Sequence, residues 1–314
     1  MRDLRIVFMG TPDFAATILQ HLVENDYNVV GVITAPDKPA GRGRKLNQSA
    51  VKKYALSQNL PILQPTNLKS EEFQENLKKW DANLQVVVAF RMLPKSVWAL
   101  PEYGTFNLHA SLLPEYRGAA PINWAIINGE SKTGVTTFFI DDKIDTGEII
   151  LQSEVTIKED EIVGELHDKL MHLGAQLVAD TLDLIAKGEV ATTKQPELEE
   201  KSAPKLYPHN CKIDWSKPLN DIYNHIRGLN PYPAAWTTIV NGENELSAKI
   251  YGVSKDPSSH NLEVGTIVTS KKELKIAVTD GYLNIHQIKI SGKKLMDAQS
   301  LLNGYQFEKE AKVL

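Results

Sequence analysis

The first 189 residues alternate short runs of β-branched residues with segments of helical periodicity, and this alternation constrains the fold more than any other feature. The runs at 5–9, 28–34 and 84–89 are almost continuously apolar, which is typical of strands covered on both faces. Helical segments at 49–58 and 70–79 separate the second run from the third. Because strands joined through helices form a parallel sheet, we predict an α/β domain with a Rossmann-like, mostly parallel sheet.

The rest of this domain continues the same pattern. We expect further strands at 105–109, 134–140 and 148–156, and a short helix at 121–128. From residue 162 to about residue 187, leucines recur with the 3.6-residue spacing of a helix that is apolar on one face. This long helix closes the first predicted domain, which we place at residues 1–189.

The pattern changes after a polar segment. Residues 190–206 contain two prolines and no sustained period, so we predict a linker there. Residues 207–314 carry short apolar runs separated by turn residues, as at 274–278 and 283–290. Such spacing predicts a second, small β-rich domain of barrel type.

The composition excludes several classes of protein. A formal net charge of −4 argues against a uniformly basic surface that coats nucleic acid, although a local basic patch is compatible with it. The single cysteine, Cys211, excludes an internal disulfide framework and a thiolate-rich metal site. The first residues enter a strand without the apolar core of a signal peptide, and no run of about 18 apolar residues occurs. We therefore expect a cytoplasmic protein without a membrane anchor, and a monomer because no apolar face is left over.

Two segments of the first domain invite a phosphate-binding interpretation. Gly10 follows the first strand, but the other glycines of G-x-G-x-x-G are missing, so a dinucleotide site is disfavoured and a tight turn is expected. The loop at 35–47 is long, and we expect it to be exposed. Its basic residues suit phosphates, although a merely solvated turn explains them about as well. These basic residues are Lys38, Arg42, Arg44 and Lys45.

Three polar side chains next to apolar runs are the candidate catalytic group. Asn107 and His109 lie on one face of a strand by the period of two, and Asp145 follows a later strand. A lone histidine is more often a hydrogen-bonded core residue, but an amide and a carboxylate nearby favour catalysis. Together they could bind a carbonyl oxygen, protonate it and hold the resulting charge. Asp141 and Asp142 also suggest a divalent cation, but the spacing of a calcium loop is absent, so we predict no metal site.

Four motifs together resemble the formyltransferase family that uses 10-formyltetrahydrofolate. They are FMGTPDFA at 8–15, AFRMLP at 89–94, FNLHASLLPEYRGAAPINWAI at 106–126 and IDTG at 144–147. The resemblance assigns catalysis to Asn107, His109 and Asp145. It assigns folate binding to Ser111, Leu112, Leu113 and Pro114 and to the loop of Arg91, Met92 and Leu93. Arg91 stands where glycine is frequent in similar sequences.

The arm AGRGRKL with its lead-in TAPDKP, and LNPYPAAWT at 229–237, resemble the members of the family that act on initiator methionyl-tRNA. In these members residues 1–189 would be the formyltransferase catalytic domain and 207–314 an OB-type β-barrel that binds tRNA. The arm would enter the acceptor end of the initiator tRNA. Its basic residues are Lys38, Arg42, Arg44 and Lys45. The resemblance thus implies formyl transfer to the methionine α-amine for translation initiation.

The expected chemistry is direct transfer without a covalent enzyme intermediate. The methionine amine attacks the formyl carbon, and Asn107 and protonated His109 donate hydrogen bonds to the oxyanion. Asp145 holds the charge on His109 and relays the amine proton. The alternatives are a formyltetrahydrofolate hydrolase, a glycinamide-ribotide formyltransferase, an enzyme that formylates an amino sugar, and an RNA-binding module with an inactive catalytic domain. The acceptor of the formyl group distinguishes them.

Overall fold

The computed structural model describes residues 1–40, 45–196 and 201–314, and the chain divides into two compact units. The first unit consists of residues 1–118, 133–155 and 167–202. The second unit consists of residues 119–132, 156–166 and 203–314. Two segments that precede the expected linker in sequence therefore pack with the C-terminal part of the chain.

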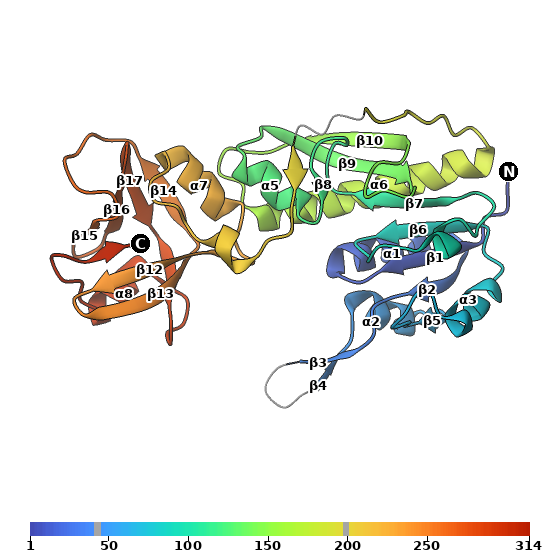
Figure 1. Cartoon of the computed structure of the whole chain (residues 1–314), viewed down its shortest axis with the longest axis horizontal. Helices are drawn as coiled ribbons and strands as arrows, with labels where there is room; N and C mark the ends of the chain where they lie inside the picture. The colour runs from blue at the N-terminus through green and yellow to red at the C-terminus, as the bar shows by residue number, and fades with distance from the viewer. Residues whose placement is uncertain (41–44, 197–200) are drawn as a thin grey trace. The chain divides into compact units, whose positions relative to one another are not determined.

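The first unit contains a seven-stranded sheet in the order β10-β9-β7-β6-β1-β2-β5 (Figure 1). Its strands are β1 (Ile6–Gly10), β2 (Val29–Ile33), β5 (Ile62–Leu63), β6 (Leu84–Val88), β7 (Thr105–His109), β9 (Lys132–Phe139) and β10 (Ile149–Thr156). The pairs β2–β5, β1–β2, β1–β6 and β6–β7 are parallel, and β9 runs antiparallel to β7. The predicted Rossmann-like parallel sheet is confirmed in these five strands, and the sheet as a whole is mixed.

Helices cover both faces of this sheet. They are α1 (Asp13–Glu24), α2 (Ala50–Ser57), α3 (Glu71–Lys78), α4 (Lys95–Trp98) and α6 (Val163–Lys187). On one face Met9 and Val87 belong to an apolar cluster with Phe73 of α3 and Val97 of α4. On the other face α6 lies so close to β7 that a Cβ on its Gly174 would come within 2.7 Å of Leu108. None of the helices in the described ranges combines the length and apolar character that crossing a bilayer requires.

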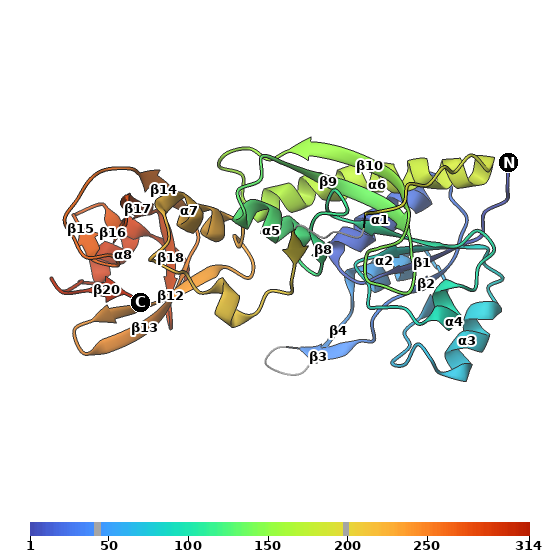
Figure 2. The same ribbon diagram turned by 45° about the horizontal axis from the view of Figure 1, so that its top comes forward.

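The basic segment at 35–47 is a hairpin at its base. Strands β3 (Lys38–Ala40) and β4 (Lys45–Asn47) pair antiparallel, which the sequence interpretation as an exposed loop missed. Figure 2 shows this hairpin leaving the sheet of the first unit. Its lead-in is held by Lys52 Nζ, 2.6 Å from Asp37 Oδ2, and by Gln64 Nε2, which donates to Asp37 Oδ1 at 2.9 Å. These two bonds hold the pKa of Asp37 below its ordinary value.

The second unit is rich in antiparallel strands, as the sequence predicts for the C-terminal region. One sheet has the order β19-β18-β13-β12-β20 and the other β14-β17-β16-β15. The strands are β12 (Ala235–Asn241), β13 (Asn244–Ile250), β14 (Val253–Asp256), β15 (Ile267–Thr269), β16 (Leu274–Val278), β17 (Gly281–Ile285), β18 (Gln287–Ile290), β19 (Met296–Asp297) and β20 (Lys312–Val313). The helices are α5 (Pro121–Ile127), α7 (Leu219–Arg227), α8 (Ala298–Gly304) and the 3-10 turn η1 (Pro208–Cys211). Two more short strands, β8 (Arg117–Gly118) and β11 (Ser202–Ala203), complete the described elements.

The core of the second unit joins its helices to its sheets. Ile222 and Ile226 of α7 are buried in one cluster with Ile239 and Ile250 of the first sheet and Ile276 of the second. Isoleucine packs well on a pleated surface, and the alternation of buried and partly exposed residues along β12 is that of a strand with one covered face.

Candidate active site

The candidate site lies at the carboxyl edge of the parallel strands. Strands β6 and β7 are neighbours, with Val87 opposite Asn107 and Val88 opposite Leu108. The segments that follow them in sequence therefore begin at one edge, where α/β sheets place ligands. Gly10 ends the adjacent β1 at the same edge, and a Cβ there would lie 2.5 Å from the Cβ of Ala15. The turn after β1 is thus a close-packed strand-to-helix turn.

His109 is the buried group at the end of β7. Its Nε2 lies 2.8 Å from the carbonyl oxygen of Tyr116. Because a carbonyl can only accept, this nitrogen carries a hydrogen. The other ring nitrogen, Nδ1, faces Asp145 Oδ2 at 3.8 Å, and the Asp145 side chain is 15% exposed. The structure therefore brings the predicted imidazole and carboxylate together, with Nδ1 as the ring atom left for chemistry.

The turn that carries Asp145 is sterically fixed. Asp145 has a left-handed φ of 55°, which is uncommon outside glycine. Its Oδ2 accepts the backbone N–H of Gly118 at 3.0 Å. Two residues later, a Cβ on Gly147 would lie 1.6 Å from the carbonyl oxygen of Phe139, so only glycine fits there. The carboxylate is held at a defined place by its backbone as well as by its own hydrogen bond.

Asn107 lies two residues before His109 on the same strand face. The intervening Leu108 and the preceding Phe106 point to the opposite, fully covered face. The Asn107 side chain is partly exposed, and in the part of the chain that the structure describes its amide has no hydrogen-bond partner. It is therefore a hydrogen-bond donor beside His109 that remains free for a ligand.

The predicted loop at Ser111–Pro114 is rigid. The Ser111 hydroxyl donates to the carbonyl of Glu115 at 2.6 Å, so it is used within the loop. Thr136 Oγ1 donates to Ser111 O at 2.6 Å and accepts from Leu113 N at 3.1 Å. Gln152 Nε2 donates to Leu113 O at 2.8 Å. These bonds leave the partly exposed side chains of Leu112 and Pro114 to contact a ligand, whereas the side chain of Leu113 is buried.

The second predicted loop presents its three residues differently. The Arg91 guanidinium donates to the carbonyl of Thr66 at 2.9 Å and to that of Pro65. The Met92 side chain is 70% exposed. Leu93 is buried in the apolar cluster under α3 and α4, so only its backbone can meet a ligand.

The predicted basic arm is described in part. Lys38 is exposed on β3. Lys45 belongs to β4, where its backbone pairs with Ala40. Arg42 and Arg44 lie outside the described residues.

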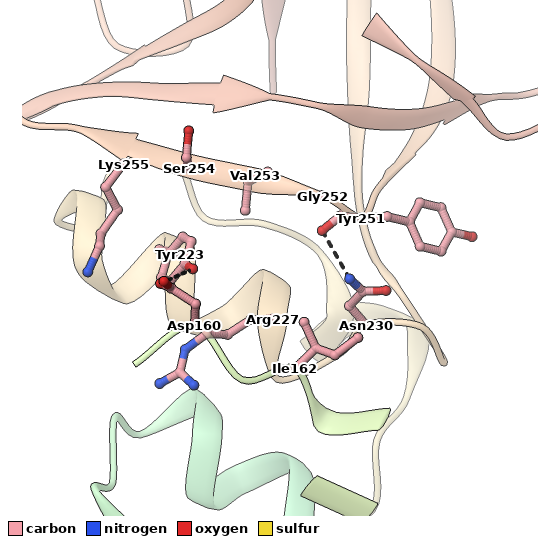
Figure 3. Close-up of a pocket in the computed structure, with 10 residues that line it drawn as sticks. All are labelled: Asp160, Ile162, Tyr223, Arg227, Asn230, Tyr251, Gly252, Val253, Ser254 and Lys255. Carbon is pink, nitrogen blue, oxygen red and sulfur yellow. Dashed lines mark hydrogen bonds between the residues drawn. The ribbon is translucent and has the colours of Figure 1, made fainter. Parts of the chain in front are cut away.

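A pocket of about 430 Å³ lies within the second unit, and none of the predicted site residues lines it (Figure 3). Tyr223 donates to Asp160 Oδ1 at 2.7 Å, and its burial together with this bond raises the pKa of the phenol. Arg227 donates to Glu161 O at 2.9 Å, and Lys255 Nζ lies 4.8 Å from the centre of the Tyr223 ring. These groups pair with one another and tie the segment before α6 to α7.

Sequence reasoning missed three side chains that shape the candidate site. Gln152 binds the loop at Leu113, and Arg117 and Gln195 hydrogen-bond to each other next to Asp145. Arg117 lies within the motif at 106–126, so the sequence does mark its segment as part of the site. Gln195 stands in the segment predicted as a linker, where nothing in the local pattern distinguishes it from its polar neighbours.

Two family profiles match the chain. The family described as "Formyl transferase" matches residues 4–182, and "Formyl transferase, C-terminal domain" matches residues 205–306. The first match covers more than half of the chain.

Curated relatives match at high identity over their full length. The chain is 59% identical to the methionyl-tRNA formyltransferase of Flavobacterium johnsoniae, with all of both chains covered. It is 54% identical to the methionyl-tRNA formyltransferase of Bacteroides fragilis, with 99% of this chain and 98% of the relative covered.

Solved structures share the fold at low identity. WlaRD, a sugar 3N-formyl transferase crystallised in the presence of dTDP and 5-N-formyl-THF, is 20% identical with a TM-score of 0.66, covering 94% of this chain and all of WlaRD. HypX from Aquifex aeolicus in complex with tetrahydrofolic acid is 16% identical with a TM-score of 0.65, covering 98% of this chain and 49% of HypX. This chain therefore shares the arrangement of its elements with both proteins.

Proposed function

The chain belongs to the formyl transferase family, and we propose that it transfers the formyl group of 10-formyltetrahydrofolate to the α-amine of methionine on initiator methionyl-tRNA. Identity over the whole length of methionyl-tRNA formyltransferases carries this proposal, since it reaches 59%, whereas the sugar 3N-formyl transferase WlaRD is 20% identical. The modified tRNA then serves translation initiation.

The roles of the three catalytic residues follow from what formyl transfer requires. When the unprotonated amine attacks the formyl carbon, negative charge develops on the formyl oxygen. The free amide of Asn107 donates to this oxygen, and Nδ1 of protonated His109 supplies a second donor. Donors fixed before the reaction stabilise such charge without reorganising during the step.

Asp145 has two tasks in this scheme. Its carboxylate, 3.8 Å from His109 Nδ1, stabilises the positive charge of the imidazolium. It also accepts the proton that the attacking amine loses, directly or through water, for delivery to the departing folate nitrogen. Bond making and breaking then balance, because the amine loses one proton and the folate nitrogen gains one.

The formyl donor is proposed to lie between the loops Ser111–Pro114 and Arg91–Leu93. Both loops start at the carboxyl edge, one after β7 and the other after β6. Exposed Met92 and partly exposed Leu112 offer apolar surface to a flat ring.

Replacing Gln152 by leucine is expected to raise the KM for 10-formyltetrahydrofolate about tenfold, since it removes the donor to Leu113 O and lets the loop relax. Steady-state kinetics with the folate varied at saturating tRNA measures this effect. Gln176→Leu is the control, because among the residues that the structure describes this glutamine bonds only to the exposed Asp180, one turn along α6. Equal KM values for the two variants would contradict the assignment of the loop.

The second unit and the arm are proposed to bind the tRNA. We further propose that the second unit is an OB-type barrel. Backbone bonds that join its two sheets support this topology. His286 N donates to Gly252 O at 2.8 Å, and Val313 N donates to Gly265 O at 2.9 Å. Barrels of this type bind nucleic acids on an open strand face.

Removing one positive charge from the arm is expected to weaken tRNA binding and to make the affinity less dependent on salt concentration. Replacing Arg42 by alanine removes one phosphate contact, so the slope of log affinity against log salt concentration falls by about one. Filter binding between low and moderate salt measures the slope. Lys78→Ala on the exposed face of α3 is the control and leaves the slope unchanged. A wild-type affinity independent of salt would contradict the role of the arm.

A formyl-transfer assay with radiolabelled formyl donor tests the proposed function. Charged initiator tRNA, charged elongator methionine tRNA, an amino sugar nucleotide and water are offered as acceptors. We expect formylation of initiator methionyl-tRNA alone. Transfer to the amino sugar, or release of formate without an acceptor, would instead support one of the alternatives.

A further inference from the structure

We propose that Gln195, braced by Arg117, is a positioning residue that sets the place of the catalytic carboxylate of Asp145. This inference rests on the proposed function and assigns a role to a residue of the segment that sequence reasoning treats as a linker.

Gln195 uses every hydrogen-bonding group of its amide on this site. Its Nε2 donates to the carbonyl of Asp145 at 3.0 Å and to that of Gly147 at 2.7 Å. Its Oε1 accepts from Nε and Nη2 of Arg117 at 3.2 and 2.7 Å. The Gln195 residue is 6% exposed. A buried amide with this set of partners cannot rotate without leaving polar groups unpaired.

Arg117 closes the arrangement from the other side. It is buried at 9% exposure and immediately precedes Gly118, whose N–H donates to Asp145 Oδ2 at 3.0 Å. The same short segment therefore binds the carboxylate through its backbone and orients Gln195 through its guanidinium. The planar fork of arginine fixes the plane of the amide it contacts, which lysine could not do.

The two bonds from Gln195 act at the point where the backbone is least favourable. Asp145 adopts its left-handed φ of 55° just before two carbonyls, its own and that of Gly147, which both accept from Gln195 Nε2. A residue held in this region persists only when its surroundings determine it. Without Gln195 the turn can relax toward ordinary backbone geometry, and the carboxylate moves relative to His109 Nδ1.

The segment around Gln195 is itself anchored to the first unit. Thr193 exchanges two backbone hydrogen bonds with Ile149 at the start of β10, each 2.8 Å long. Thr192 Oγ1 donates to Glu148. These bonds hold residues 192 and 193 against the start of β10, the outermost strand of the sheet. Gln195 follows two residues later and so reaches the turn of Asp145. The described start of the expected linker is thus a fixed part of the first unit.

The test is Gln195→Met, which keeps the length of the side chain and removes its donors and acceptor. We expect kcat to fall by about 100-fold, the loss that a misplacement of about 1 Å can cause. The KM values for folate and tRNA should stay within about threefold, because no substrate contact is removed. Gln195→Glu, which can still pair with Arg117 but has no hydrogen to donate to the two carbonyls, should show the same split. A raised KM with unchanged kcat in both variants would overturn the proposal.

Two comparisons separate positioning from a general loss of stability. Asn241→Leu removes another buried amide that bonds Tyr305, Gln306 and Glu308, and it should lower Tm without lowering kcat. In an Asp145→Asn background, Gln195→Met should cost at most about twofold more, since a residue that acts through Asp145 has no further effect once Asp145 is inactive. Losses that add in full, or an equal fall in kcat for Asn241→Leu, would overturn the proposal.

A readout that needs no acceptor keeps this proposal distinct from the proposed function. In histidine-labelled protein, the ring signal of His109, assigned by its loss in His109→Asn, should shift in Gln195→Met toward its position in Asp145→Ala. An unchanged signal would overturn the positioning role even if tRNA is formylated. A shifted signal would support it even if another acceptor is found.

Discussion

Replacing His109 by asparagine is expected to lower kcat for formyl transfer by about 100- to 1,000-fold, the range that loss of one donor to a developing oxyanion causes. Asparagine is smaller and remains polar, but it has no atom at the position of His109 Nε2, so the 2.8 Å contact with the carbonyl of Tyr116 is lost as well. It cannot become a cation opposite Asp145, whose Oδ2 lies 3.8 Å from Nδ1. Single-turnover formylation of initiator methionyl-tRNA measures the chemical step, and equilibrium binding of folate should be unchanged.

A second histidine on the same unit offers a matched control. His167 also faces a carboxylate, with Nδ1 3.0 Å from Asp168 Oδ1, but this pair is exposed on α6. His167→Asn should therefore leave kcat within about twofold, because exposed ion pairs contribute little. A His109→Asn enzyme with near-wild-type turnover would remove His109 from the catalytic group.

Most of the central sheet could be predicted because its longer strands are specified locally, whereas the edge strand β5, with two residues, was not predicted. The almost continuously apolar runs at 28–34 and 84–89 are typical of strands covered on both faces, and β2 and β6 lie within them. The hairpin of β3 and β4 could not be predicted, because its strands have three residues each and one contains Pro39. Such short pairings depend on tertiary contacts rather than on local preference.

The division of the chain into two units could not be predicted from the sequence, for a different reason. Helix α5 precedes β9 in the chain and follows β7, so its position in the alternation suggested the first domain. In the structure Asn123 Nδ2 donates to Gly228 O at 2.8 Å, and a Cβ on Gly228 would lie 2.7 Å from Ile127. This packing inside the second unit joins residues about 100 positions apart, and no periodicity records it. A truncation at residue 207 would uncover α5, so point variants test the function better.

In the candidate site, the sequence alone identifies polar residues that stand beside apolar strands. It does not identify the residues that hold these polar side chains in place. Asn107, His109 and Asp145 stand out as polar groups beside apolar strands. Gln195 is one polar residue in a polar segment, and only the return of residues 192–195 to the edge of β10 gives it a role. Support of this kind depends on contacts far apart in sequence, which composition and spacing do not encode.

Replacing Asn107 by leucine is expected to lower kcat by about 100- to 1,000-fold, the cost of removing one donor to a developing oxyanion. Leucine has nearly the same size and suits a strand that is parallel to β6 on one side and antiparallel to β9 on the other. The amide it replaces has no hydrogen-bond partner among the described residues, so its loss leaves no protein group unpaired. The variant should therefore keep the Tm of the wild type while it loses turnover, and thermal melting beside single-turnover kinetics measures both.

Asn83→Leu reverses this expectation and serves as the control. Asn83 lies next to the amino end of β6, at the edge away from the candidate site, where it accepts from Arg5 N at 2.8 Å and donates to Asp3 O at 2.8 Å. Its replacement leaves two backbone groups without their partner, which costs about 1–3 kcal/mol for each buried one, but it touches no substrate. We therefore expect a lowered Tm with unchanged kcat for Asn83→Leu. If Asn107→Leu behaved in the same way, the amide at 107 would be a structural group, and the oxyanion would need another donor.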